Sequence, residues 1–189
     1  RQPDLVVEMA DPFSVSAEGQ IPNFTIYQQL PPELKNEDHL VEAIQILPGV
    51  IPAVHHSSFG VVHLKAGTKV GTGAAWPGGP IIPGALLDAN GKSIAGAGDA
   101  NKAEGGRRRF GRPEAGEFRF CCYVPGGTFR QYRAGTGQRI PRDGIISWGT
   151  HYTPIGKPVV DKTRVGLWFQ REYTKEILGN VPSGLKHIV

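Results

Sequence analysis

Histidines are the residues of this chain whose type and spacing best suit chemistry, and two of them are adjacent. The stretch "VHHSSFG" places His55 and His56 inside a largely apolar run that is typical of a β-strand. Neighbouring side chains on a regular strand point to opposite faces of the sheet, so a regular strand would hold the two imidazoles apart. The pair is therefore either a polar interruption in a sheet or part of a metal site.

A third histidine strengthens the metal hypothesis. His151 lies near the end of a second strand-like run, "GIISWGTHY", before a turn rich in Pro, Gly and Lys. We expect two strand ends on facing sheets to bring His55, His56 and His151 together, where three neutral imidazoles suit either one copper or one zinc ion. For both members of the doublet to reach one ion, the backbone must twist or bulge there. Thr150 or Tyr152 would then fix an imidazole tautomer by a hydrogen bond.

The other histidines and the cysteines favour structural roles. A lone histidine on a strand is usually a hydrogen-bonded structural residue, and we interpret His39, His63 and His187 in this way. The two cysteines, Cys121 and Cys122, are adjacent, and the chain has no Cys-x-x-Cys spacing. Zinc binding by cysteines and thioredoxin-like chemistry are therefore not supported.

The positive charge of the chain is local. The net charge is +4, and much of the excess comes from "RRRFGR" at 107–112. A nucleic-acid-binding surface would spread basic residues along a face with interleaved aromatic residues, so we predict no nucleic-acid partner. The cluster is more typical of a solvated loop or a protein-docking patch. No apolar run approaches the length of a membrane-spanning helix, and none is predicted.

The elements that must position these residues are predicted to be short β-strands. The chain contains 26 Gly and 16 Pro, a composition that suits strands joined by turns. Only "PPELKNEDHLVEAI" has helical character, in a turn that begins at "PPEL". We predict an all-β fold, an antiparallel β-sandwich of jelly-roll-like type. Its strands are expected within 4–9, 23–30, 39–47, 53–64, 117–124, 144–152 and 164–173.

One domain accounts for the whole chain, 1–189, with one segment of different character inside it. Residues 67–116 are dominated by Gly, Ala and Pro and show little periodicity, which predicts a long Gly/Pro-rich loop or insertion within the sandwich. The chain begins at Arg1 without Met and without a charged-then-apolar leader. We therefore expect a processed protein or a piece of a longer one.

The motifs around the histidines resemble a known family. They are, in order, "LVEAIQILPGVIPAVHH", a long Gly-rich stretch, and "GQRIPRDGIISWGTHYTPIGKPVVDKTRVGLWF". This order resembles the N-terminal half of copper type II, ascorbate-dependent monooxygenases, the peptidylglycine and dopamine hydroxylase group. It is especially similar to bacterial relatives that carry "VVHH" followed by "HYTPNGK…DRT.VGL". The resemblance extends from about Leu5 to Phe169, and "HYTPIGKPVVDKTRVGL" is its most specific part.

The resemblance implies a fold, a metal and a set of ligands. Each catalytic unit of that family has two β-sandwich domains with one copper each. The first domain holds its copper with an adjacent His pair and a third His in an "HYG"-like stretch, which correspond here to His55, His56 and His151. That copper accepts electrons from the reductant and passes them on. The resemblance also implies an extracytoplasmic location, periplasmic or secreted.

The chain departs from the family in one respect that limits its function. The second, oxygen-activating copper of the family is held by a His-x-His pair and a methionine in the second domain. This chain has no His-x-His, and its only methionine, Met9, lies in the first predicted strand. The chain alone is therefore not expected to be a complete hydroxylase. The 67–116 segment is also longer and more basic than the family suggests, and it lacks the disulfide cysteines of the best-known members.

Two hypotheses about function follow. The first is a copper-binding redox domain that transfers electrons and works with a second domain or with protein partners. The second is a structural or accessory subunit that docks on a larger extracytoplasmic complex through its long loop and basic cluster, with or without a metal. A third, a sugar- or ligand-binding jelly roll without metal, leaves the combination of His55, His56 and His151 unexplained.

Overall fold

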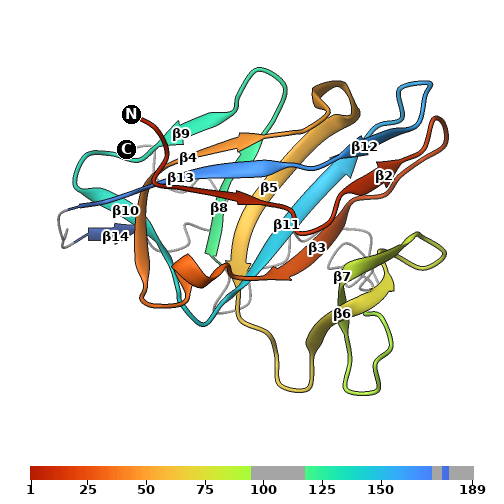
Figure 1. Ribbon diagram of the computed structural model, residues 1–189, viewed down its shortest axis with the longest axis horizontal. Helices are drawn as coiled ribbons and strands as arrows, with labels where there is room; N and C mark the ends of the chain where they lie inside the picture. Colours follow the sequence, from red (N-terminus) through yellow and green to blue (C-terminus); the bar gives the residue numbers. More distant parts are fainter. Residues whose placement is uncertain (95–117, 172–175, 179–189) are drawn as a thin grey trace, which may run out of the picture.

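Two main β-sheets pack face to face in the computed structural model, which describes residues 1–94, 118–171 and 176–178 (Figure 1). Neighbouring strands are antiparallel except for the parallel pair β10–β14. The six-stranded sheet has the order β1-β13-β4-β10-β14, with β9 also paired to β4. Its strands are β1 (Leu5–Glu8), β13 (Arg164–Phe169), β4 (His39–Leu47), β10 (Thr136–Ile140), β14 (Glu176–Leu178) and β9 (Phe129–Gln131).

The second main sheet has four strands in the order β3-β11-β5-β8. These strands are β3 (Phe24–Gln29), β11 (Ile145–Tyr152), β5 (Val54–Val62) and β8 (Phe118–Tyr123). Two small two-stranded sheets complete the described fold. One pairs β2 (Phe13–Val15) with β12 (Val159–Asp161), and the other pairs β6 (Lys69–Ala74) with β7 (Ile81–Leu87).

Alternating apolar residues on the two main sheets fill the space between them. Each side chain in this layer loses contact with water on folding, and burial of one such aliphatic or aromatic side chain contributes roughly 1.5–3 kcal/mol. The indole N–H of buried Trp148 is not left unpaired, because it donates to Gln28 Oε1 at 2.8 Å. The predicted all-β sandwich is confirmed. Eight residues of this layer with at most 1% exposure are Ile44, Ile46, Phe59, Val61, Ile146, Trp148, Val165 and Leu167.

Each run that the sequence predicted as a strand contains one, and the predicted helical turn is present as a short 3-10 helix, η1 (Pro32–Leu34). A second 3-10 helix, η2 (Ile51–Ala53), leads directly into β5. Within the described part of the chain, no helix is long and apolar enough to cross a membrane.

The first part of the segment 67–116, predicted to be a long loop or insertion, is a β-hairpin formed by β6 and β7. Its glycines replace the larger side chains whose alternation would mark a strand, because neighbouring atoms leave no room for a Cβ. A Cβ at Gly71 would lie 2.6 Å from the Leu87 side chain, and one at Gly84 would lie 2.6 Å from the carbonyl oxygen of Tyr27 in β3. Gly71 thus makes room for a side chain of the hairpin itself, and Gly84 lets β7 lie directly against β3. The remainder of the segment, including the basic cluster 107–112, lies outside the described residues.

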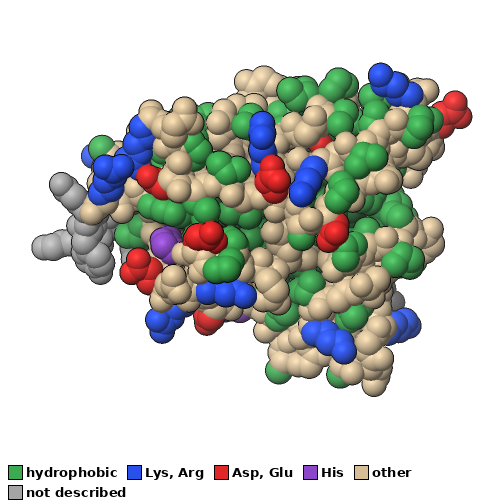
Figure 2. Space-filling view, viewed as in Figure 1, with side chains coloured by type: hydrophobic (Ala, Val, Ile, Leu, Met, Phe, Trp, Pro, Cys, Tyr) green, Lys and Arg blue, Asp and Glu red, His purple; other side chains and the backbone are tan. Residues whose placement is uncertain are grey.

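Charged side chains of both signs are interspersed with apolar ones on the face shown in Figure 2. Several of the described charges are paired, as in Arg1–Asp4 at 2.7 Å and Arg139–Asp38 at 2.9 Å. On this face the described basic residues therefore form no continuous stripe.

Candidate metal centre

Strands β5 and β11 place the three predicted ligands side by side in one sheet. The two strands pair antiparallel, with Ser57 opposite Thr150 and His56 opposite His151. Residues directly opposite each other in an antiparallel pair have Cβ atoms about 4.5–5.5 Å apart, which is close enough for two imidazoles to meet. The expectation that the ligands come from facing sheets is wrong. They come from neighbouring strands of the same sheet, so strand pairing itself brings them together.

A β-bulge brings the third imidazole to the same place. After His56 and His151 the register shifts, and the next pair is Val54 opposite Tyr152, so His55 is an extra residue on β5. In a bulge two residues of one strand oppose one residue of its neighbour, and the strict alternation of faces is lost. The predicted irregularity at the doublet is confirmed. The strands stay joined beyond it, because the Thr153 N–H donates to the Ala53 carbonyl at 2.8 Å.

The Nδ1 atoms of the three histidines converge. The Nδ1 atom of His55 lies 3.2 Å from that of His151 and 3.3 Å from that of His56. One potential ligand atom from each residue lies within 4.8 Å of the others. Nitrogen ligands at about 2.0–2.1 Å from a tetrahedral ion are separated from each other by about 3.3–3.4 Å. Two of the three spacings therefore match those expected around one ion before any side chain moves.

Hydrogen bonding between the rings cannot satisfy this arrangement. An imidazole nitrogen carries either one proton or one lone pair in the plane of its ring. The Nδ1 atom of His55 faces the Nδ1 atoms of both His56 and His151, so it can donate to one or accept from one but cannot bond well with both. A single cation at the centre would accept all three lone pairs. The geometry thus fits a metal ion better than it fits three rings bonded to one another.

The surroundings of the cluster favour neutral imidazoles. Burial lowers the pKa of His56 below its ordinary value, and the neighbouring His151 and His55 lower it further. Burial and His55 likewise lower the pKa of His151, although a backbone hydrogen bond to Ile21 opposes them. The cluster itself contains no carboxylate. His56 and His151 therefore present free lone pairs at pH 7, the protonation state that a metal ligand needs.

The cluster is open to solvent, and the neighbouring residues of its strands form a buried polar pair on the inner face of the sheet. His55 is exposed, whereas His56 and His151 are partly buried. Beneath them the Ser57 and Thr150 hydroxyls lie 3.1 Å apart, and both residues are buried. An ion at this position would therefore be accessible from solvent while its ligands are held by the sheet.

The predicted contact of Thr150 or Tyr152 with an imidazole is wrong. The Thr150 hydroxyl bonds with Ser57, and the Tyr152 hydroxyl donates to Asp161 Oδ2 at 2.9 Å. Both side chains point into the core, with 2% and 1% exposure. Burial raises the pKa of Tyr152, and the charge of Asp161 raises it further, so the phenol remains a donor.

Two of the remaining histidines have hydrogen-bonding partners of their own, as predicted. His39 Nε2 lies 3.1 Å from the Glu33 carbonyl oxygen, and His63 Nε2 lies 3.0 Å from Asp143 Oδ1. His187 lies outside the described residues. Neither His39 nor His63 belongs to the three-histidine cluster.

Met9 is also removed from the cluster's chemistry. It follows β1 and is only 1% exposed, packed within the hydrophobic core. Its thioether therefore packs in the core and is not accessible to a metal ion from solvent.

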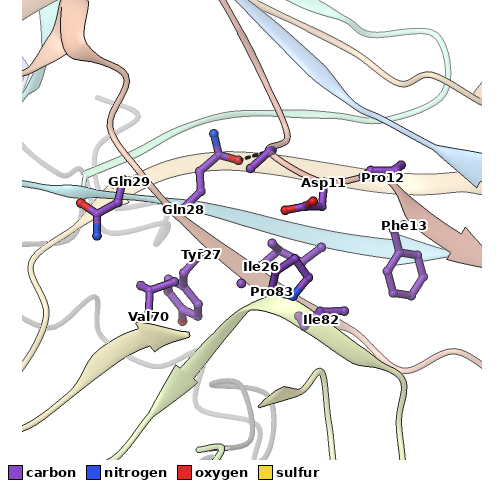
Figure 3. Close-up of a pocket in the computed structure, with 12 residues that line it drawn as sticks. Asp11, Pro12, Phe13, Ile26, Tyr27, Gln28, Gln29, Val70, Ile82 and Pro83 are labelled. Atoms are coloured by element: carbon purple, nitrogen blue, oxygen red, sulfur yellow. Dashed lines mark hydrogen bonds between the residues drawn. The ribbon is translucent and has the colours of Figure 1, made fainter. Parts of the chain in front are cut away.

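An open cleft of about 380 Å³ lies between β3, the β1–β2 connection and the β6–β7 hairpin (Figure 3). Asp11 is the only ionisable carboxylate in its lining, which is otherwise mainly apolar. The Gln28 side chain at its edge is already bonded to the Ala10 N–H, the Trp148 indole and the Glu8 carbonyl. None of the three clustered histidines lines the cleft, so it is separate from the candidate metal centre.

Comparison of the chain with protein-family models, with curated proteins and with solved structures found no match. The three-histidine cluster, its geometry and its surroundings are therefore the features from which a function is proposed.

Proposed function

We propose that His55, His56 and His151 bind one copper ion through their Nδ1 atoms and that the chain is a copper-binding redox domain that transfers electrons. The convergence of three Nδ1 atoms at one point, with two spacings of 3.2 and 3.3 Å, is the observation that carries this proposal. The motif resemblance to the first domain of ascorbate-dependent copper monooxygenases supports the same assignment.

Three imidazoles accept either copper or zinc, and the general affinity order of divalent ions favours copper. Bound copper supplies one-electron chemistry, because it cycles between Cu(I) and Cu(II). For a given set of nitrogen ligands, divalent copper binds more tightly than divalent zinc. Zinc also accepts three histidines, with water as a fourth ligand, and remains the competing ion.

Features of the chain orient the histidines and leave the site accessible to a reductant. The bulge directs His55 and His56 to one side, and the lowered pKa values of His56 and His151 keep these ligands neutral. Exposure of His55 leaves a path by which a soluble reductant or a partner protein reaches the site. Electrons can therefore enter and leave at the same surface.

A complete hydroxylase is not proposed for this chain. The sequence has no His-x-His pair, and Met9 is packed in the core. We propose that a second domain or a protein partner supplies the oxygen-activating site, and that the protein acts outside the cytoplasm, as the resemblance implies.

Copper titration of the purified chain tests the proposal. We expect one Cu(II) per chain with a nitrogen-ligated EPR spectrum, and we expect the signal to disappear with ascorbate and return on reoxidation. Competition with zinc measures the selectivity of the site. Failure to bind copper tightly would overturn the proposal. Tight binding of an ion that ascorbate cannot reduce would favour the alternative, a structural or accessory subunit that docks on a larger complex.

A further inference from the structure

A buried carboxylate accepts hydrogen bonds from residues that lie close in the chain to the clustered histidines. Asp161, the last residue of β12, is 0% exposed. Its Oδ1 atom accepts a hydrogen bond from the Val50 backbone N–H at 2.8 Å. Its Oδ2 atom accepts one from the Tyr152 hydroxyl at 2.9 Å and one from the Thr163 hydroxyl at 2.8 Å. One side chain thus gathers three donors from three segments of the chain.

Two of these donors belong to the segments that carry the histidines. Val50 directly precedes η2, which leads into β5 and His55. Tyr152 directly follows His151 at the end of β11. The carboxylate is therefore bonded to the last residue of β11 and to the segment that leads into β5, at the end of the strand pair where the bulge occurs.

The chain makes room for this contact. A Cβ at Gly49 would lie 2.9 Å from the Lys162 backbone nitrogen and 3.2 Å from Asp161 Oδ1. Any side chain at this position would force the turn before η2 away from the carboxylate. The absence of a side chain lets Val50 approach to hydrogen-bonding distance.

Stability alone does not account for a carboxylate at this place. Moving a charged group out of water is costly unless several hydrogen bonds offset the loss, and an apolar residue of similar volume is often as stable. Among the described residues no cationic side chain pairs with Asp161, so the three donors provide the compensation. What an apolar residue could not provide is a fixed link between Val50 and Tyr152.

We propose that Asp161 is a positioning residue for the histidine cluster. By binding Val50 and Tyr152 together it fixes the ends of β5 and β11, so that the bulge holds His55 and His56 beside His151. The role extends to metal affinity only if the cluster binds a metal, and in that respect the inference rests on the proposed function.

Three substitutions separate positioning from general stability. Asp161→Asn keeps the size of the side chain but replaces one acceptor oxygen by an NH2 group. Tyr152→Phe removes only the hydroxyl and keeps the ring that stacks on Phe13 at 4.8 Å. Thr163→Val is the matched control, because it removes a donor from the same Oδ2 atom without touching either histidine-bearing strand.

The first readout needs no metal. We expect NMR signals of the His55 and His56 imidazoles to shift in metal-free Asp161→Asn and Tyr152→Phe proteins, although both substitutions lie far along the chain from this doublet. The same signals should stay unchanged in Thr163→Val. If the doublet signals do not move, or move equally in the control, the positioning role is overturned. Should Asp161→Asn fail to fold, Tyr152→Phe still decides the question.

The second readout is copper affinity, which should fall by about tenfold in Asp161→Asn and Tyr152→Phe. This is the lower end of the 10–100-fold loss that follows removal of a direct hydrogen-bond partner of a metal ligand, because neither residue bonds to an imidazole. Thr163→Val should match the wild type. Shifted histidine signals in a protein that binds no copper would overturn the proposed function and support the positioning role. Normal copper binding with unmoved histidine signals in the variants would support the proposed function and overturn the positioning role.

Discussion

The β5–β11 strand pair has the three-histidine cluster at one end and a single histidine, His63, next to the other end, and the two ends have opposite chemistry. At one end His56 lies opposite His151, with His55 added by a bulge. At the other end the pairing is regular, with Ile145 opposite Val62. There His63, the residue after β5, bonds to Asp143, which precedes β11, at 3.0 Å.

The difference shows that neighbours decide what a histidine can do. A carboxylate that bonds to an imidazole occupies a nitrogen that would otherwise bind metal. A second imidazole beside the first disfavours protonation, since two like charges would then repel. The same residue type at the two ends of one strand pair is therefore a hydrogen-bond partner of a carboxylate at one end and a candidate ligand at the other.

Replacing one histidine at each end tests this comparison most strongly. His151→Ala should weaken copper binding by more than the 10–100-fold typical of losing an outer hydrogen-bond partner, because it removes a ligand. His63→Ala, the matched control at the opposite end, should bind copper like the wild type. Isothermal titration or competition with a chelator measures both affinities, and circular dichroism confirms that the folds are retained.

Equal copper affinity in His151→Ala and wild type would remove the distinction between the two ends. Unfolding of His151→Ala would instead mean that the cluster is needed for the fold, which favours a structural site.

Acidification should weaken copper binding at the end of the strand pair that carries the cluster. Burial, together with neighbouring imidazoles, places the pKa values of His56 and His151 below the ordinary value, so both are mainly neutral above about pH 6.5. Once the pH lies below the pKa values of the ligands, copper must displace protons, and affinity should fall by at least about tenfold per pH unit. Titrations between pH 8 and pH 5 measure this dependence. A copper affinity that does not change over this range would contradict binding through imidazole nitrogens.

The three histidines of the cluster could be predicted from sequence because each lies in a recognisable strand. His55 and His56 interrupt an apolar run, and His151 ends another, so both strands were visible from their composition. The need for a bulge also followed from the alternation of side chains. Which strands would be neighbours could not be predicted, because His55 and His151 are 96 residues apart and many pairings bury the same apolar faces.

Other parts of the fold carry too little pattern to be found in the sequence. Strands β2, β9 and β12 have only three residues each, which is less than two periods of alternation. The β6–β7 hairpin uses glycine where a strand normally has side chains, since it packs directly on β3. Asp161 follows a short apolar pair in "KPVVDKT", a context typical of an exposed turn. Thr163 is a local donor, but the other two donors, Val50 and Tyr152, come from outside this stretch, and no local signal marks them.

The smallest effect is expected from Asp143→Asn, which breaks the ion pair at the regular end. The hydrogen bond from His63 is the main reason that the pKa of Asp143 lies below its ordinary value. A carboxyl with a lowered pKa in the folded state stabilises the protein above its unfolded-state pKa, and this contribution disappears as the pH falls through the folded-state pKa. The Asp143 side chain is 74% exposed, so water and salt screen the pair. The free energy of unfolding should therefore fall by no more than about 1 kcal/mol at pH 7 and low salt, and by less at high salt or in acid.

Urea denaturation under these conditions measures the change, with copper affinity as the control. A clear loss of copper affinity in Asp143→Asn would show that the two ends of the strand pair are coupled, and the contrast between them would then not be local.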